Sequence, residues 1–110
     1  MSRVDTAGSE VLFAWDDGAL VKTKVTQCAL ARVCGACGAS LGRPVAFVGT
    51  ADEVGRNAFH APPLHEACAD DVRRLLDPSW ETVLTGGFEF VRPAKHDADK
   101  RSTFVPNSLL

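Results

Sequence analysis

The spacing of apolar residues in the second half of the chain predicts one principal helix. Five apolar residues fall at the period of one helix face, and they are Leu64, Cys68, Val72, Leu75 and Leu76. Pro63 suits a first helical position, where its missing N–H is not needed. Pro78 marks the end of the pattern. We therefore expect a helix that begins at Pro63 and ends before Pro78.

Shorter apolar runs predict strands, since they contain the β-branched and aromatic residues that strands favour. Residues 11–15 and 20–25 flank a turn signal at residues 16–18, Asp-Asp-Gly, which predicts a β-hairpin. A further strand is expected at residues 44–48, and a short one at residues 58–60. The fold class that follows is α+β, with antiparallel hairpins and one main helix.

A second, closing hairpin is predicted after the helix. Residues 82–84 and 88–91 flank the glycine pair at 86–87, and the later run alternates clearly between apolar and polar side chains. Residues 50–57 are polar, and we interpret them as a connection between strands.

The ends of the chain differ in character from its centre. Residues 1–10 are small and polar and are interpreted as a flexible leader, so that the expected domain covers residues 11–92. Residues 93–110 are interpreted as a tail, in which 93–103 are charged and exposed. The apolar end of this tail, residues 104–110, can pack on its own domain or on a partner.

Two pairs of metal-ligating residues stand out, in the pattern Cys34-x2-Cys37-x27-His65-x2-Cys68. Thiolate and imidazole are the ligands that tetrahedral zinc prefers. The short spacer of the first pair lets both sulfurs converge at a tight turn. The second pair is three residues apart at the start of the predicted helix, so both side chains share a face. The sequence therefore predicts one zinc ion per chain; iron is the chemical alternative, but this ligand set is more typical of zinc.

The order of elements around these ligands resembles a treble-clef zinc finger, in which a cysteine knuckle and a hairpin precede a helix that supplies the last two ligands. The resemblance covers about residues 28–77. The ligand order Cys-Cys-His-Cys is also similar to half of a LIM domain. The middle spacer is long for that family and no second set of four ligands follows. The resemblance thus implies the treble-clef architecture without naming a specific family.

Two further residues, Cys28 and His60, are weighed as alternative ligands or as residues that support the ligands. Cys28 can replace His65 to give a four-cysteine site, or it can pack as a small buried hydrophobe, which its apolar neighbours favour. His60 is a weaker substitute for His65. His96 lies among charged residues and is interpreted as solvated. The alternative to a metal site is that these cysteines are unrelated thiols and that the histidine is near them by chance. The arrangement of the four residues in two closely spaced pairs disfavours that alternative.

Composition narrows the class of protein. The chain has 110 residues, 45% of them hydrophobic, which suits one small domain with its own core. Twelve basic residues stand against 14 acidic ones, so the formal net charge of −2 disfavours nucleic-acid binding without excluding a local basic patch. No secretory signal and no apolar stretch of about 20 residues is present, so we expect a cytoplasmic protein with reduced cysteines.

A non-enzymatic role follows from the same pattern. Four protein ligands close a tetrahedral zinc site, whereas catalytic zinc keeps a position for water. No acid–base pair or activated serine is recognisable, and no catalytic residue is assigned. A thiol-redox function of Cys34 and Cys37 is the minor alternative, since the βαβ context of such motifs is lacking. A small enzyme subunit is another.

Two kinds of partner are considered. The first hypothesis is a protein-interaction or accessory module, with a protein or a second copy of the chain as partner and no membrane. Its candidate surface is apolar and consists of Phe88, Phe90, Phe104, Leu109 and Leu110, unless these residues complete the core. The second is nucleic-acid binding by one basic strip, which would require the helix and the tail to be neighbours. Its residues are Arg73, Arg74, Arg92, Lys95, Lys100 and Arg101.

Overall fold

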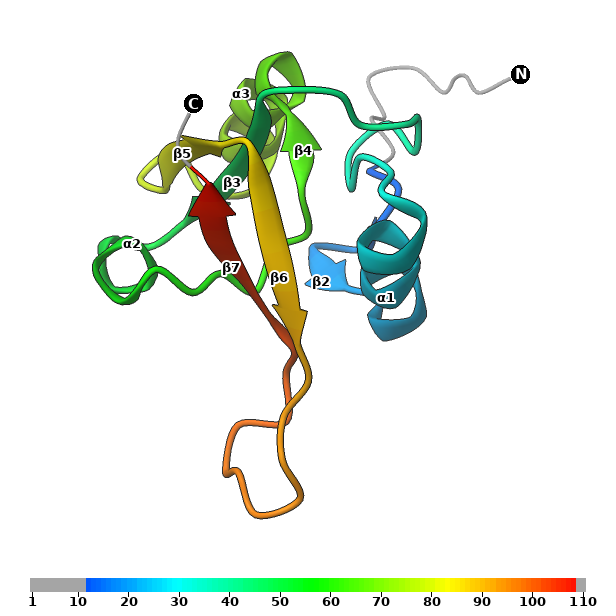
Figure 1. The fold of residues 1–110 in the computed structure, drawn as a ribbon. Coiled ribbons are helices and arrows are strands. Elements are labelled where there is room, and N and C mark those ends of the chain that lie inside the picture. The colour runs from blue at the N-terminus through cyan, green and yellow to red at the C-terminus, as the bar shows by residue number, and fades with distance from the viewer. Residues whose placement is uncertain (1–11, 109–110) are drawn as a thin grey trace.

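The computed structural model describes residues 12–108 and shows a mixed α+β fold with antiparallel pairing between its strands (Figure 1). The elements in chain order are β1 (Trp15–Asp16), β2 (Ala19–Leu20), α1 (Lys22–Ala31), β3 (Val45–Gly49), α2 (Ala51–Arg56), β4 (Leu64–His65), α3 (Glu66–Leu76), β5 (Glu81–Thr85), β6 (Gly87–Val91) and β7 (Thr103–Ser108). The predicted α+β class is confirmed. The leader at residues 1–10 and the end of the tail, Leu109 and Leu110, lie outside the described residues.

Strand β3 is the centre of the structure. It lies between β4 and β5 in a three-stranded sheet, and all five of its residues are buried. Its alternate side chains point to two different cores. Ala46 and Val48 pack with α3 and the cysteine-rich segment, whereas Val45 and Phe47 pack in an aromatic cluster with the C-terminal strand. This two-sided burial explains why the strand expected at residues 44–48 is apolar throughout.

The turn of the first predicted hairpin is confirmed, but its strands are shorter than expected, with two residues each. β1 pairs with β2 around Asp17 and Gly18, which both have positive φ, as a two-residue hairpin turn requires. The strand expected at residues 20–25 is wrong, because the chain enters helix α1 at Lys22. Only Val25 and Cys28 of α1 are buried, three residues apart on one face, so the helical period is barely marked in the sequence.

A second helix, α2, which was not predicted from the sequence, lies within the polar connection at residues 50–57. Thr50 and Glu53 form a capping box: the Glu53 N–H donates to Thr50 Oγ1 at 3.1 Å, and the Thr50 N–H donates to Glu53 Oε1 at 2.9 Å. Asn57 ends the helix in the left-handed conformation. The helix has six residues and no buried side chain, so no hydrophobic period announces it.

Glu53 also holds His60, and this suggests a test of its charge. The carboxylate accepts hydrogen bonds from the His60 backbone N–H at 3.1 Å and from His60 Nδ1 at 2.7 Å. Burial alone raises the pKa of Glu53, but the hydrogen bonds from Thr50 and His60 outweigh it and hold the pKa below its usual value. A lowered folded-state pKa stabilises the fold at neutral pH, and the effect is lost as pH falls through that pKa.

We therefore expect Glu53→Gln to lower the free energy of unfolding by about 1–3 kcal/mol at pH 7, because the charge-assisted bonds weaken. Asp52→Asn is the matched control. It removes the same charge one residue away, from an exposed pair with Arg56, and should cost less than about 1 kcal/mol. Urea unfolding at pH 7 measures both, and equal losses would show that only the charge near the helix terminus matters.

The closing hairpin predicted around residues 86–87 is wrong. β5 pairs with β3, and β6 pairs with β7 from the C-terminal end of the chain. Between them, Thr85 Oγ1 lies 2.7 Å from the carbonyl oxygen of Gly87 and 2.6 Å from that of Ser108, so its single hydroxyl hydrogen can be donated to either. The side chain thus bridges the start of β6 and the end of β7. The glycine pair at residues 86–87 therefore lies where the chain leaves the sheet of β5 and enters the sheet of β6.

The C-terminal strand completes the aromatic core. Phe104 is fully buried, and its ring centroid lies 5.0 Å from Phe90 and 5.7 Å from Phe47 and Phe88. The backbone of Phe104 exchanges two hydrogen bonds with that of Phe59, at 2.7 and 2.9 Å. This isolated bridge stands in place of the short strand that was expected at residues 58–60. Phe104 is therefore core and not partner surface.

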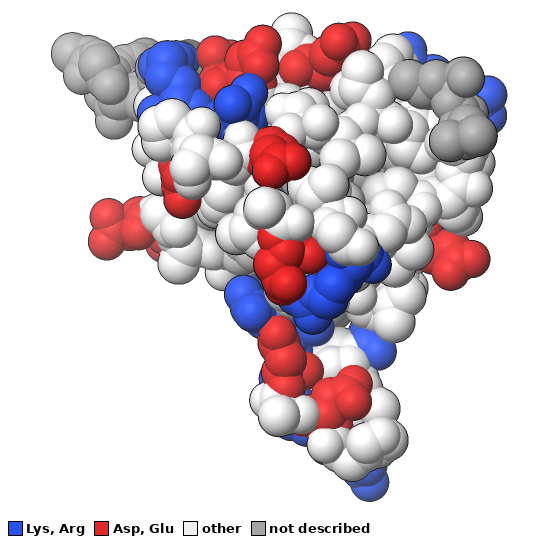
Figure 2. Space-filling model, turned by 90° about the vertical axis from the view of Figure 1, so that its left-hand side faces the viewer, with Lys and Arg blue, Asp and Glu red and all other residues white. Residues whose placement is uncertain are grey.

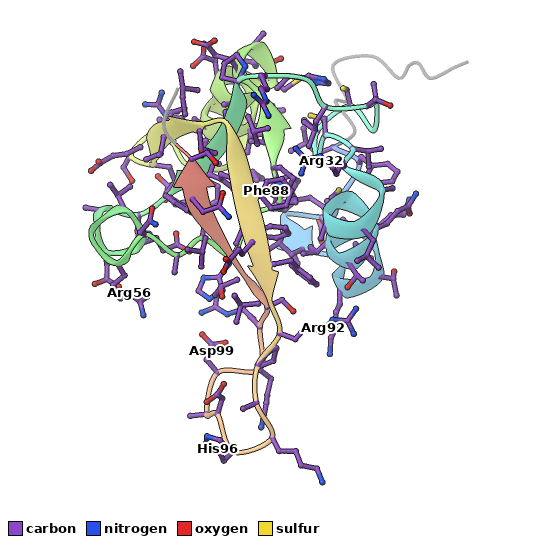
Figure 3. The ribbon with its side chains drawn as sticks, viewed as in Figure 1. Arg32, Arg56, Phe88, Arg92, His96 and Asp99 are labelled. Carbon is purple, nitrogen blue, oxygen red and sulfur yellow. The ribbon has the colours of Figure 1, made fainter. Side chains whose placement is uncertain are left out.

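The segment between β6 and β7 projects from the body, as Figure 1 shows in orange. Its residues are mostly exposed, as expected for residues 93–103, and the side chain of His96 near its tip is 87% exposed (Figure 3). Within residues 12–108, no helix has both the length and the apolar character that crossing a bilayer demands.

Candidate metal centre

The structure brings the four predicted ligands together. The ligand atoms of Cys34, Cys37, His65 and Cys68 all lie within 4.8 Å of one another. Nδ1 of His65 is 3.4 Å from Cys37 Sγ and 3.8 Å from Cys68 Sγ. Around one tetrahedral zinc ion, nitrogen and sulfur ligands would be about 3.6 Å apart and two sulfurs about 3.8 Å apart. The cluster therefore has the dimensions of a single metal site.

The first two ligands lie on a tight turn whose shape depends on glycine. The Gly38 N–H donates to the Cys34 carbonyl at 2.8 Å, and Gly38 has a φ of +77° that other residues rarely adopt. Gly35 is needed for a different reason: a Cβ at this position would lie only 2.4 Å from Pro62 Cγ. The knuckle can thus pack directly against the segment that leads to the other two ligands.

The sulfur of Cys34 lies between two backbone N–H donors. Cys34 is fully buried, and its Sγ accepts backbone N–H groups from Ala36 at 3.3 Å and from His65 at 3.4 Å. Hydrogen bonds of this kind stabilise a metal-bound thiolate and orient it. One of the two donors, Ala36, belongs to the knuckle, and the other, His65, belongs to the second ligand pair. The hydrogen bond from His65 therefore links the two ligand pairs.

The second pair lies where β4 passes into α3. The helix begins at Glu66, three residues later than expected, because Leu64 and His65 still pair with β3. The two prolines before them favour extended backbone. His65 is therefore the residue that precedes the first helical turn, and Cys68 lies within that turn. The predicted end of the helix before Pro78 is confirmed.

A hydrogen bond selects which nitrogen of His65 faces the cluster. Nε2 lies 2.9 Å from the carbonyl oxygen of Ser40, on the strand side of the knuckle. A carbonyl only accepts, so Nε2 carries the proton and donates it. In the neutral ring, Nδ1 then has a free lone pair, and it is Nδ1 that points at the sulfurs of Cys37 and Cys68. This is the arrangement of a ligating histidine with a backbone partner.

No family model, curated protein or solved structure matches the chain. What indicates the chemistry is therefore the cluster itself: three cysteine sulfurs and one imidazole nitrogen that can hold a metal ion.

The thiol of Cys68 is protonated in the metal-free chain at neutral pH. Burial is the largest cause, followed by the charges and hydrogen bonds of Cys34 and Cys37, and together they raise its pKa to about 12. Sulfur binds a metal as thiolate, so metal binding displaces this proton.

Cys28 and His60, the alternative ligands, lie outside the cluster of four. Cys28 is fully buried on α1, and burial and then the charge of Cys34 raise the pKa of its thiol to about 11. It packs as a hydrophobic core residue. His60 is held by Glu53, as described above.

The basic strip considered for nucleic acid does not form. Arg73 and Arg74 lie on α3, at the opposite end of the molecule from the projecting segment with Lys95 and Lys100 (Figure 1). Arg101, in that same segment, pairs with Asp99 at 2.9 Å. On the face shown in Figure 2, acidic and basic side chains are interspersed, including on the projecting segment.

Two of the expected partner-surface residues remain partly accessible. Phe88 and Phe90 lie on β6 and are half-buried. The guanidinium group of Arg32 lies 4.9 Å from the centroid of the Phe88 ring, and that of Arg92 lies 5.7 Å from that of Phe90 (Figure 3). This strip of two aromatic rings, each with an arginine side chain over it, was not recognisable in the sequence, because Arg32 directly follows α1 and is far from β6 along the chain.

Proposed function

We propose that the chain is a structural zinc-binding domain in which Cys34, Cys37, His65 and Cys68 hold one Zn²⁺. The observation that carries this proposal is the convergence of four ligand atoms within 4.8 Å, with Nδ1 of His65 turned toward the sulfurs. Thiolate sulfur combined with imidazole in a tetrahedral arrangement suits zinc.

A structural role is better supported than catalysis. Four protein ligands fill a tetrahedral site and leave no position for water or substrate. The ion would fasten the knuckle to the junction of β4 and α3, in addition to contacts such as the Gly35 N–H to Pro63 carbonyl bond at 2.8 Å and the shared packing of Cys34 and Leu64. Such a site contributes its binding free energy directly to folding.

The architecture supports a treble-clef assignment. A knuckle at residues 34–38 is followed by the antiparallel pair β3–β4 and by α3, whose first turn provides Cys68. This is the order of elements in a treble-clef finger. Helix α2 is inserted between β3 and β4, and this insertion accounts for the long spacer between the ligand pairs.

The zinc domain is proposed to act as a protein-interaction or accessory module. Its support is the surface of β6, with Phe88 and Phe90 under Arg32 and Arg92. Aromatic and arginine side chains are enriched at protein interfaces. In the described part of the chain β6 pairs only with β7, so its other edge can receive a strand. Nucleic-acid binding has weaker support, since the basic residues that it needs are scattered.

Two cysteine variants test the proposed ligand set. Native mass spectrometry of the wild type should find one zinc per chain. Cys28→Ala should keep that zinc, because Cys28 is a core residue, whereas Cys34→Ala should lose it. Each variant removes one fully buried thiol, so they are matched in packing cost. Loss of zinc from Cys28→Ala with retention in His65→Ala would instead establish a four-cysteine site. The same spectra report whether the partner is a second copy of the chain.

A further inference from the structure

A second site candidate lies away from the metal centre, where the projecting segment joins the body. A cavity of about 300 Å³ opens between the start of α1 and the residues that precede β7. Its floor is apolar, and its rim carries basic side chains. The residues that matter are Leu20 and Val25 on the floor and Lys22, His60, Lys100 and Arg101 on the rim. No carboxylate is among the described residues that line it.

A hydrogen bond to Glu53 fixes the orientation of the His60 ring at this cavity. Glu53 accepts its Nδ1–H at 2.7 Å, and both side chains are only 12% exposed. Because an ionised carboxylate only accepts, Nδ1 is the donor and the ring cannot turn freely. Nε2 therefore faces away from Glu53, toward Asp99 at 3.4 Å.

The chain already places one carboxylate in this basic environment. Asp99 accepts two hydrogen bonds from the Arg101 guanidinium group, at 2.9 and 3.1 Å, and lies beside Nε2 of His60 (Figure 3). The hydrogen bonds from Arg101 hold the pKa of Asp99 well below its usual range. The surroundings of His60 thus stabilise a negative charge.

Asp99 does not neutralise the whole rim. The ammonium group of Lys100 donates a hydrogen bond to the carbonyl oxygen of Lys95 at 2.5 Å. This acceptor carries no full charge, so the charge of Lys100 is not neutralised by it. Lys22 is exposed at the first position of α1, and within residues 12–108 no ion pair is recorded for it. Two ammonium groups that have no carboxylate partner among the described residues therefore border an apolar floor.

We propose that this cavity binds a small amphipathic carboxylate, with its apolar chain on Leu20 and Val25 and its charge near Lys22 and Lys100. The volume is at the lower end of the range for small-molecule pockets and suits about six to ten carbon atoms. Apolar walls with a few convergent charged groups are typical of such pockets. This site is independent of the zinc proposal, since none of its residues is a metal ligand.

The test is an NMR titration of the full zinc-loaded chain with four probes. Hexanoate should shift the amide signals of the lining residues and saturate. Acetate has the charge without the chain, and hexanol has the chain without the charge; each should bind at least about tenfold more weakly. Hexylamine should not bind. Equal binding of hexanol and hexanoate, or no saturable shift by hexanoate, would overturn the proposal.

Two variants localise the effect. Lys22→Glu should weaken hexanoate binding by about tenfold or more, and it should fold normally because an acidic residue is favourable at a helix N-terminus. Lys95→Glu makes the same change of charge on the projecting segment, but its side chain does not line the cavity. Lys95→Glu should change the affinity for hexanoate by less than about twofold, since exposed charges outside the cavity are largely screened by salt. Equal weakening by both variants would contradict a defined site.

Discussion

Removing the metal from the four-ligand centre is expected to unfold most of the chain. Apparent binding free energies of structural zinc sites are about 10–16 kcal/mol in small peptides, and the stability of a whole domain is about 5–15 kcal/mol. The centre also belongs to the core here: Cys34 and Ala36 are buried in the same cluster as Leu64 and Val72. Without the ion, only hydrogen bonds such as those to Cys34 Sγ and from His65 Nε2 would hold the three thiols and the imidazole together.

Circular dichroism during thermal unfolding, with a strong zinc chelator at pH 7.5, measures this effect. We expect loss of the cooperative transition and its return on addition of zinc. The control is the same chelator already saturated with zinc. A metal-free chain that still melts cooperatively near the original temperature would show that the core holds the fold by itself.

Cys37 allows the same question to be asked without a chelator. Its side chain is exposed, unlike the buried Cys34, so Cys37→Ser removes a ligand at little packing cost. A large loss of stability in this variant therefore comes from the metal bond itself and not from a cavity in the core.

The cluster of four candidate ligands was predictable from sequence because its information is local. Each ligand pair is separated by two residues, and each pair lies on one short segment, the knuckle or the junction of β4 and α3. Only the meeting of the two pairs is a long-range event, and metal chemistry supplies the reason for it. The hydrogen bond from His65 Nε2 to Ser40 has no such signal, since the backbone carbonyl of any residue could accept it.

The two missed helices differ in what the sequence could have shown. α2 carries a readable start signal, Thr50 followed three residues later by Glu53, which is the pattern of a capping box. α1 has no capping side chain and buries only Val25 and Cys28 in ten residues. Its alternation of β-branched and polar residues near residues 21–25 imitates a strand, so tertiary packing decides the outcome there.

The pairing of β6 could not be read from local pattern. Gly86 and Gly87 between two apolar runs are typical of a hairpin, but β3 takes β5 as its own partner. β6 must then pair elsewhere, and the apolar residues after the charged segment supply β7. The choice depends on the aromatic side chains that fill the second core, which meet only in the folded chain.

Phe104→Ala is expected to be the most destabilising substitution outside the metal centre, lowering the free energy of unfolding by about 3–5 kcal/mol. Its fully buried ring contacts three other phenylalanines, and its removal leaves a cavity between β3 and the β6–β7 pair. Two backbone hydrogen bonds to Phe59 hold this strand in place, so the surroundings cannot easily collapse into the gap.

Phe90→Ala is the matched control, because it removes the same side chain from the facing position of β6, where the residue is only half-buried. It should cost clearly less, about 1–2 kcal/mol, since less area returns to water. Urea unfolding in excess zinc measures both losses. Both variants should still bind one zinc per chain, because the aromatic cluster packs on Val45 and Phe47, on the opposite side of β3 from the metal centre. An equal cost for the two variants would mean that the C-terminal strand is only loosely attached.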